Sequence, residues 1–214
     1  MSVDETPIAI PTPGGPTQAI WQPAHEPSRA ALLCVGGFDG GFAGPANGIY
    51  ADLGAALPQR GIDVLRLDFR VKRSPGPIDE GTIDVVAGVD WLSGEGAGRV
   101  ILVGHSYGGA IVLRAGLRRK ESVCGVAALS TQTAGIEQVA ELAPIPLLLV
   151  HGLDDTRLPP RLSQFVYQEA AEPKSLHLLE GATHSLRQKR DKLWSILTDW
   201  IEATLTAAAD NGAN

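Results

Sequence analysis

Cysteine is scarce in this sequence, with only Cys34 and Cys124 among 214 residues. So few cysteines exclude a small secreted scaffold held together by several disulfides. Both lie inside apolar runs, which favours two buried, reduced thiols in a cytoplasmic protein, although a single bridge between them also fits the count. We therefore expect a fold stabilised by its hydrophobic core rather than by cross-links.

An excess of basic charge is also missing. The chain has 18 Lys and Arg against 24 Asp and Glu, which gives a net charge of −6 and a pI near 5.3. There is no basic stripe interleaved with aromatic residues, which argues against nucleic acid as a partner. The apolar runs are shorter than the ~18 residues of a membrane helix, and the acidic start lacks the basic and apolar regions of a signal peptide. We expect no membrane insertion and a cytoplasmic location.

The chain does contain short apolar segments that alternate with amphipathic ones. Hydrophobic residues make up 44% of the sequence, enough for the core of one domain. Residues 1–29 hold two short strands, 8–10 and 18–21, and form an N-terminal hairpin and extension of the same domain. The main domain spans 30–207, and 208–214 is expected to be a flexible tail.

Strands and helices alternate through the main domain. The strand-like segments are 30–35, 64–67, 100–103, 123–129, 147–150 and 175–179, and the helical patterns cover 49–57, 85–92, 110–117, 162–171 and 193–205. This alternation predicts a parallel sheet covered by helices on both faces. The fold class is therefore α/β, a single domain with a mostly parallel sheet and short antiparallel N-terminal strands.

A serine follows one of the buried strands. The segment Val100–Ala110 reads V-I-L-V-G-H-S-Y-G-G-A and places G-x-S-x-G between a strand and a helix. Gly104 and Gly108 remove side chains that would clash in such a cramped turn, which leaves the Ser106 hydroxyl exposed. The helix N-terminus adds N–H groups and a positive dipole end near a developing oxyanion. The alternative is an ordinary glycine-rich turn with an incidental serine.

A serine hydroxyl needs a base and an orienting carboxylate to act as a nucleophile, and both occur downstream. Segment 147–159, L-L-L-V-H-G-L-D-D-T-R-L-P, ends a strand in a turn with Asp154 and Asp155. Segment 176–185, L-H-L-L-E-G-A-T-H-S, ends the next strand in a turn with His184. Of the three common triad orders, serine, then aspartate, then histidine is that of the α/β-hydrolases.

These motifs carry a resemblance to a known family. With G-H-S-Y-G-G, H-G-L-D-D-T-R-L-P and G-A-T-H each following a strand, the chain from Ala30 to Leu205 resembles small, lidless α/β-hydrolase-fold serine hydrolases of the esterase and dienelactone-hydrolase-like superfamily. The resemblance implies a triad of Ser106, Asp155 and His184, with no cofactor and no metal. The family's acid loop, H-G-x-x-D-x-x-x-P, selects Asp155 over Asp154, which is then a turn residue.

The resemblance also implies an oxyanion hole built from two backbone N–H groups. One belongs to Tyr107, directly after the nucleophile, and the other to Phe38 in the glycine-rich loop 36–44. Because backbone groups donate, the donor does not depend on the side chain at either position.

The sequence leaves little room for a cap over the site. Too few residues separate Ser130 from Leu147 for the usual helical lid, and 134–142 has room for one short helix. We therefore expect an open, shallow site suited to small or extended esters. The residues expected to frame it are Phe38, Phe42, Tyr107 and Leu158, with Phe42 and Leu158 contacting the substrate.

Other reactive side chains have simpler interpretations. The remaining histidines lack metal-ligand spacing, and most are expected to be structural. They are His25, His105, His151 and His177. Trp194 and Trp200 of the last helix are expected in the core. A basic cluster after the strand 64–67 is more typical of a solvated loop than of a site for an acidic substrate group. It consists of Arg70, Lys72 and Arg73.

The favoured function is hydrolysis of a carboxylic ester of a small acyl substrate through an acyl-enzyme. Thioesterase, amidase and acyltransferase activities are alternatives, because the same triad serves all of them. A ligand-binding or receptor module with little turnover is the alternative from another class, and saturable binding without product release would distinguish it. The sequence leaves monomer and homodimer equally open.

Overall fold

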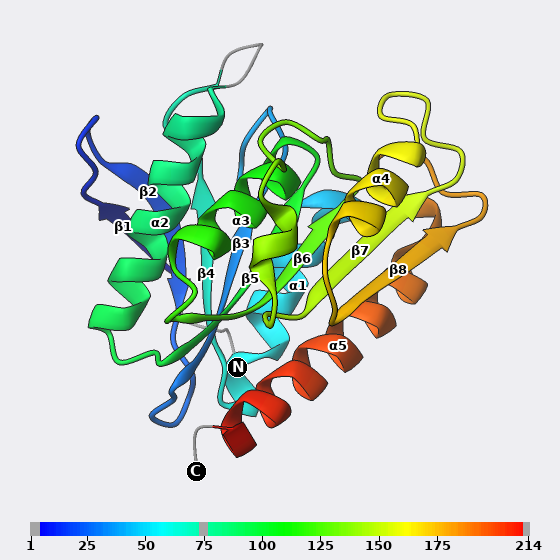
Figure 1. Ribbon diagram of the computed structural model, residues 1–214. Coiled ribbons are helices and arrows are strands. Elements are labelled where there is room, and N and C mark those ends of the chain that lie inside the picture. Colours follow the sequence, from blue (N-terminus) through cyan, green and yellow to red (C-terminus); the bar gives the residue numbers. More distant parts are fainter. Residues whose placement is uncertain (1–4, 73–76, 212–214) are drawn as a thin grey trace.

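The computed structural model describes residues 5–72 and 77–211 (Figure 1). Its strands are β1 (Thr6–Ile10), β2 (Thr17–Gln22), β3 (Ala30–Val35), β4 (Asp63–Asp68), β5 (Arg99–His105), β6 (Val123–Leu129), β7 (Leu147–Gly152) and β8 (Lys174–Leu179). Its α-helices are α1 (Pro45–Ala56), α2 (Ile78–Gly94), α3 (Tyr107–Arg118), α4 (Arg161–Glu169) and α5 (Arg190–Asn211). Short 3-10 helices occur at η1 (Pro58–Arg60), η2 (Val139–Leu142) and η3 (Arg187–Lys189).

All eight strands belong to one sheet, in the order β1-β2-β4-β3-β5-β6-β7-β8. The pairs β1–β2 and β2–β4 are antiparallel, and the five pairs from β4–β3 to β7–β8 are parallel. The N-terminal hairpin therefore extends the main sheet. This confirms the predicted single-domain α/β fold with an antiparallel start, and it gathers the carboxyl ends of β3 to β8 at one edge.

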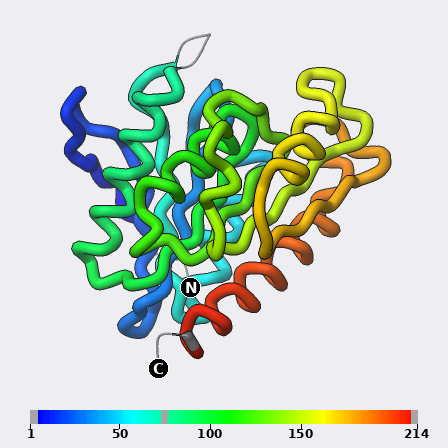
Figure 2. The backbone as a smooth tube through the Cα atoms, in the orientation of Figure 1, coloured from blue at the N-terminus to red at the C-terminus, as the bar shows by residue number. Residues whose placement is uncertain are grey.

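Each face of the sheet has its own hydrophobic core, because successive residues of a strand point to opposite sides. In β3, Leu33 and Val35 pack beneath α2 and α3, whereas Leu32 and Cys34 pack beneath α1 and α5. The continuous apolar runs of the sequence thus contribute side chains to the cores on both faces of the sheet. Figure 2 follows the chain between the two layers, with α2, α3 and α4 on one face and α1 and α5 on the other.

The C-terminal helix is longer than predicted. α5 continues to Asn211, so residues 208–211 of the predicted tail are helical, and 212–214 lie outside the described residues. Alanine is the strongest helix former, and the run 207–209 prolongs the helix beyond its last core contacts. Trp194 and Trp200 are partly buried against the core under α1 and α5, as expected.

The prediction of a solvated basic loop was wrong for Arg70. Its side chain is 9% exposed and forms ion pairs with Asp84 at 2.5 Å and Glu80 at 2.7 Å, both on α2. Lys72 is 41% exposed, and Arg73 lies outside the described residues. The acidic partners follow Arg70 by ten and 14 residues, so only the docking of α2 beside β4 brings them into reach.

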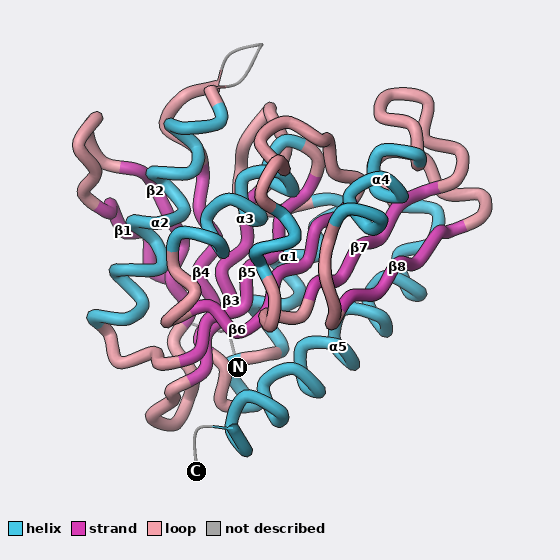
Figure 3. The backbone as a smooth tube through the Cα atoms, viewed as in Figure 1, coloured by secondary structure: helices cyan, strands magenta, loops and turns pink. Residues whose placement is uncertain are grey.

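The connection between β6 and β7 carries only η2 in the described part of the chain (Figure 3). No helical cap covers the carboxyl edge of the sheet there, which agrees with the predicted lidless architecture. Both cysteines are free thiols, and burial raises the pKa of each, that of Cys124 to about 11. Among the described helices, none is both long and apolar enough to cross a membrane.

Candidate active site

Three predicted site residues meet at the carboxyl edge of the sheet. Ser106 follows β5, Asp155 follows β7 and His184 follows β8. These strands lie in the consecutive order β5-β6-β7-β8, so the turns at their carboxyl ends are neighbours. Parallel pairing thereby joins side chains that are 29 and 78 residues apart in the chain.

Ser106 occupies a strained turn, with φ 57° and ψ −114°. Non-glycine residues rarely adopt such angles, and the strain costs on the order of 1–3 kcal/mol. A Cβ at Gly104 would overlap the Gly108 carbonyl, and one at Gly108 would overlap the Gly36 carbonyl. The Ser106 N–H donates to the Leu129 carbonyl at 2.8 Å, which ties the turn to β6. Both glycines of G-x-S-x-G are therefore sterically required.

The hydroxyl, imidazole and carboxylate form a continuous hydrogen-bond chain. Ser106 Oγ lies 2.9 Å from His184 Nε2, and His184 Nδ1 lies 2.7 Å from Asp155 Oδ2. Because the ionised carboxylate only accepts, Nδ1 carries the proton and Nε2 accepts from the serine hydroxyl. That tautomer is the one a general base requires. Asp154 is exposed instead, and its backbone N–H donates to the Ala182 carbonyl.

The Asp155 carboxylate is fully buried but well supplied with donors. Its Oδ1 accepts the backbone N–H groups of Arg157 and Leu158, each at 2.9 Å. Burial opposes ionisation, but these N–H groups and the hydrogen bond from His184 outweigh it and lower the pKa of Asp155. The carboxylate is therefore charged at neutral pH and able to orient the imidazole.

A second histidine, His151, contacts the same carboxylate. Its Nε2 lies 3.1 Å from Asp155 Oδ2 and 2.8 Å from the Leu158 carbonyl, and its Nδ1 lies 2.6 Å from Ser163 Oγ. Burial lowers the pKa of His151, so the ring is neutral. The sequence placed His151 among the structural histidines. Two signals could have placed it beside the site: it stands four residues before Asp155, and it is the first residue of the H-G-x-x-D-x-x-x-P pattern.

A third histidine, His105, links the Ser106 turn to the loop that carries His184. Its Nε2 lies 2.9 Å from the His184 backbone carbonyl, and the two imidazole rings are 4.9 Å apart between centroids. Burial lowers the pKa of His105 to about 4, so this ring is neutral over the physiological range. A neutral His105 with a proton on Nε2 donates to that carbonyl and fixes the loop that carries His184.

The two backbone groups expected in the oxyanion hole belong to elements beside the serine. Tyr107 opens α3 directly after Ser106, and Phe38 lies in the loop after β3, next to Gly37, which packs against Ser106. Within 5–72 and 77–211, neither N–H has a protein acceptor, whereas Gly41 N–H donates to an Asp68 carboxylate oxygen. Both groups are therefore free to bind a ligand oxygen.

A cavity of about 380 Å³ opens in front of the serine. Its walls include Phe38, Phe42, His184 and Arg157, and much of the remainder is the glycine-rich loop. Leu158 was predicted to frame this cavity and is not among its lining residues. This volume is at the small end of the range for ligand sites, which agrees with a small substrate.

The side chain of Tyr107 was also expected to frame the site, and it turns into the core instead. Its hydroxyl donates to the Pro77 carbonyl at 2.8 Å, and its ring stacks edge-on against Phe69 with the centroids 5.1 Å apart. Burial, with the nearby charges of Asp84 and Glu80, raises the pKa of Tyr107 to about 12. Tyr107, like Leu158, is therefore not among the residues that line the cavity.

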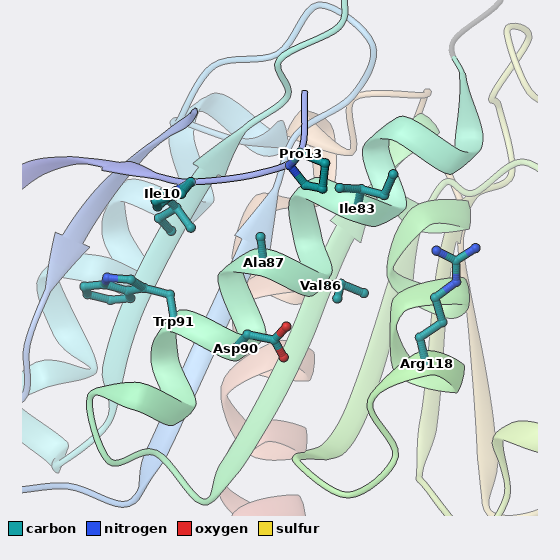
Figure 4. Close-up of a pocket in the computed structure, with 9 residues that line it drawn as sticks. Ile10, Pro13, Ile83, Val86, Ala87, Asp90, Trp91 and Arg118 are labelled. Atoms are coloured by element: carbon teal, nitrogen blue, oxygen red, sulfur yellow. The ribbon is translucent and has the colours of Figure 1, made fainter. Parts of the chain in front are cut away.

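A second cavity, of about 490 Å³, lies between the hairpin turn and α2 (Figure 4). Its walls are mainly apolar, and its two charged side chains have partners, since Asp90 pairs with Arg119 and Arg118 with Asp79. No serine, cysteine or histidine lines it in the described part of the chain. This second cavity therefore offers no nucleophilic serine or cysteine and no histidine base among the described residues.

No cluster of three or more His, Cys, Asp or Glu suited to a metal ion occurs among residues 5–72 and 77–211. The histidines near the serine are committed to other partners: His184 and His151 contact Asp155, and His105 contacts a backbone carbonyl. The chemistry that this geometry supports is nucleophilic attack by an activated serine hydroxyl.

The fold and the site define a class of protein. The sequence profile of the alpha/beta hydrolase fold family matches residues 30–211, and the chain belongs to that family. Its topology, with the Ser106 turn after β5 and no cap between β6 and β7, is that of a single α/β-hydrolase-fold domain.

Similar proteins come from several bacteria. The protein YfhR of Escherichia coli is 30% identical over 156 residues, and the match covers 60% of this chain but only 55% of YfhR. Rv2307c of Mycobacterium tuberculosis is 27% identical, over 94% of this chain and 79% of its own length. The chain therefore spans little more than half of the Escherichia coli relative.

Solved structures share the fold at lower sequence identity. A dienelactone hydrolase from Anabaena variabilis superimposes with a TM-score of 0.80 at 18% identity, over 94% of this chain and 97% of its own. Est1E from Butyrivibrio proteoclasticus gives a TM-score of 0.78 at 15% identity, over 94% of this chain and 99% of its own. At these identities the likeness concerns the fold.

Proposed function

We propose that this protein hydrolyses carboxylic esters through an acyl-enzyme formed on Ser106. The observation that carries the proposal is the chain from Ser106 Oγ to His184 Nε2 at 2.9 Å and from His184 Nδ1 to Asp155 Oδ2 at 2.7 Å. The strained serine turn supports it, because such strain persists where a function depends on it. The names of the structural neighbours, a dienelactone hydrolase and Est1E, agree with an acyl substrate.

Acylation follows from the positions of these groups. Ser106 Oγ forms a bond to the ester carbonyl carbon as its proton passes to His184 Nε2, and Asp155 stabilises the resulting imidazolium. The backbone N–H groups of Tyr107 and Phe38 stabilise the negative charge on the carbonyl oxygen. When the tetrahedral intermediate collapses, the bond to the alcohol breaks and His184 returns the proton to the leaving oxygen.

Deacylation repeats these steps with water as the nucleophile. His184 takes a proton from a water molecule, whose oxygen attacks the acyl carbon, and the same two N–H groups stabilise the second oxyanion. Collapse breaks the bond to Ser106 Oγ, which recovers its proton from His184, and the carboxylic acid leaves. No cofactor enters this scheme.

The cavity supports a small acyl group as substrate. Its volume of about 380 Å³ and its backbone-rich wall leave little apolar surface for a long acyl chain. Phe38 and Phe42 are its two aromatic walls, and both come from the loop after β3. We expect acetyl and butyryl esters to be cleaved faster than esters of long-chain acids.

A fluorophosphonate probe tests the proposal directly. Such probes react with an activated serine, so intact-mass analysis of wild type should show one adduct and Ser106→Ala should show none. The surface Ser195→Ala variant is a matched control and should label like wild type. If wild type stays unlabelled, or if Ser106→Ala still accepts one adduct, the assignment of Ser106 is wrong.

Turnover then separates ester hydrolysis from related activities. Short p-nitrophenyl esters should give free acid with a burst or steady release of nitrophenol, and Ser106→Ala should not turn over. If wild type is labelled but cleaves only thioesters or amides, the substrate class in this proposal is wrong. If it binds esters saturably without releasing product, the protein is a binding module.

A further inference from the structure

The mechanism above leaves one buried side chain beside the triad without a role. His151, at the end of β7, is 0% exposed and touches the acid loop on one side and α4 on the other. Burying an imidazole is unfavourable unless both of its nitrogens find partners. The partners of its two ring nitrogens therefore indicate the role of this side chain.

The protonation of His151 follows from its neighbours. Its Nε2 faces the Leu158 carbonyl at 2.8 Å and Asp155 Oδ2 at 3.1 Å. A carbonyl oxygen and an ionised carboxylate can only accept, so Nε2 carries the proton and shares it between them. The neutral ring then has a bare Nδ1, which accepts the hydroxyl proton of Ser163 at 2.6 Å. The two acceptors at Nε2 thus set the tautomer of His151, and the Ser163 hydroxyl satisfies its bare Nδ1.

The same contact completes the set of donors around the acid. Asp155 Oδ1 accepts two backbone N–H groups, and Oδ2 accepts N–H groups from His184 and His151. The Leu158 residue is held twice, because its N–H donates to Asp155 and its carbonyl accepts from His151. Both carboxylate oxygens accept hydrogen bonds, and the Asp155 side chain is closed to water. Rotation of the carboxylate would therefore break hydrogen bonds that water cannot replace.

We propose that His151 and Ser163 are positioning residues that hold the Asp155 carboxylate and its loop in the orientation that His184 needs. The inference rests on the proposed function, since it assigns these side chains a role in the same reaction. The hydrogen-bond chain from the nucleophile thus extends through the acid to α4, from Ser106 by way of His184, Asp155 and His151 to Ser163.

Removing the His151 donor has two consequences for Asp155. The carboxylate gains rotational freedom, so Oδ2 is aligned with His184 Nδ1 in a smaller fraction of the molecules. It also becomes more basic, because one N–H no longer stabilises its charge, and it therefore holds the imidazolium proton more strongly. The first lowers kcat, and the second moves the acid limb of the pH profile of kcat/KM to higher pH.

Four variants test the proposal. His151→Leu removes both nitrogens at similar volume, whereas His151→Gln keeps an N–H where Nε2 stands. Ser163→Ala removes the hydroxyl that donates to His151 Nδ1. His177→Gln is the matched control, because His177 lies in register on the neighbouring strand β8, beside Val150 of β7, and is exposed.

We expect His151→Leu to lower kcat about 10- to 100-fold at unchanged KM, less than the loss of Asp155 itself. His151→Gln should recover most of that activity, Ser163→Ala should lose about threefold to tenfold, and His177→Gln should match wild type. The acid limb of His151→Leu should also move to higher pH. The low-field proton resonance of His184 Nδ1–H should broaden or shift in His151→Leu and stay in place in His177→Gln.

The readouts distinguish the possible failures. If wild type is not labelled by the fluorophosphonate, the proposed function and this inference fall together. If wild type is labelled and folded His151→Leu matches it in kcat and pH profile, only the positioning role is overturned. If His151→Leu does not fold, Ser163→Ala and His151→Gln provide the test. A wild-type His184 Nδ1–H resonance together with wild-type activity in Ser163→Ala would then contradict the proposal.

Discussion

Two buried carboxylates, Asp155 and Asp84, are equally hidden from water but carry opposite shifts in pKa. Their side chains are 0% and 1% exposed. Burial raises the pKa of Asp84, and the N–H and guanidinium of Arg70 only partly offset it. At Asp155 the N–H groups of Leu158 and the hydrogen bond from His184 outweigh burial and lower the pKa. Asp155 accepts four N–H groups and Asp84 two, and the nearby charge of Glu80 raises the pKa of Asp84 further.

This difference matches the position of each carboxylate in the fold. Asp84 and Arg70 join α2 to the end of β4, which fixes one helix against the sheet. Asp155 faces His184, which contacts the Ser106 hydroxyl. A buried ion pair with a single cation is typical of structure, whereas an ionised carboxylate held by N–H donors beside a histidine is typical of an active site. The comparison yields four tests.

The largest effect is expected from replacing Ser106 or His184, which the hydrogen-bond chain links to Asp155. Ser106→Ala and His184→Ala should each lower kcat for a short p-nitrophenyl ester by about 10⁴- to 10⁶-fold, because nucleophile and base act as a unit. Thermal unfolding should show that Ser106→Ala is at least as stable as wild type, since it keeps the fold and loses little packing. Full activity in both variants would exclude the triad.

The next test sets the two carboxylates directly against each other. Asp155→Asn should lower kcat about 10⁴-fold, because an amide stabilises the wrong imidazole tautomer. Asp84→Asn should leave kcat within about twofold of wild type and lower the free energy of unfolding by about 1–3 kcal/mol, because Arg70 loses its buried partner. Ester assays and urea unfolding of both variants measure the two effects. Equal losses of activity would remove the distinction between them.

The pH dependence of stability should also differ in sign. Asp155 has a lowered pKa in the folded state, so the stability it contributes is present above the unfolded carboxyl value and is lost as the pH falls. Asp84 has a raised pKa, so its contribution is present at low pH and is lost as the pH rises through that raised value. The urea midpoint should be measured between pH 3 and 7 for both variants and wild type. Compared with wild type, the midpoint should depend less on pH at the acid end of this range in Asp155→Asn, and less at the upper end in Asp84→Asn.

The smallest effect concerns a cation near Asp155 that has no acidic partner in the described residues. Arg157 lines the cavity, and its backbone N–H donates a hydrogen bond to the buried Asp155 carboxylate. This bond fixes the backbone from which the Arg157 side chain extends. We expect Arg157→Gln to lower kcat/KM about threefold to tenfold for an ester with a carboxylate on its acyl group, and to leave the matching neutral ester unchanged. Arg161→Gln, outside the cavity, is the control. An equal effect on both esters would exclude charge selection by Arg157.

Much of the site was predictable because its signals are local. The G-x-S-x-G spacing around Ser106 follows from the space that Gly104 and Gly108 must leave, and that requirement is encoded in nearby residues. His184 and Asp155 were found because each follows an apolar strand. The roles assigned to them stay predictions until the variants above are measured.

The missed features depend on contacts between distant segments. His105 contacts the backbone of His184, 79 residues later, and no spacing in the sequence marks that pair. Arg70 found its acidic partners only through the packing of α2. Leu158 was placed in the substrate cavity from its position in the acid loop, but its carbonyl faces His151 and its side chain lies outside the cavity wall.

The sequence by itself determined the order of strands and helices, the two-sided burial of the strands and the cramped serine turn. These depend on periodicity and on local steric exclusion, which short segments carry in full. Only the tertiary structure decided which buried acid has a lowered pKa and which histidine touches it. Such properties depend on donors from separate strands and helices, and the register of the parallel sheet brings those donors together.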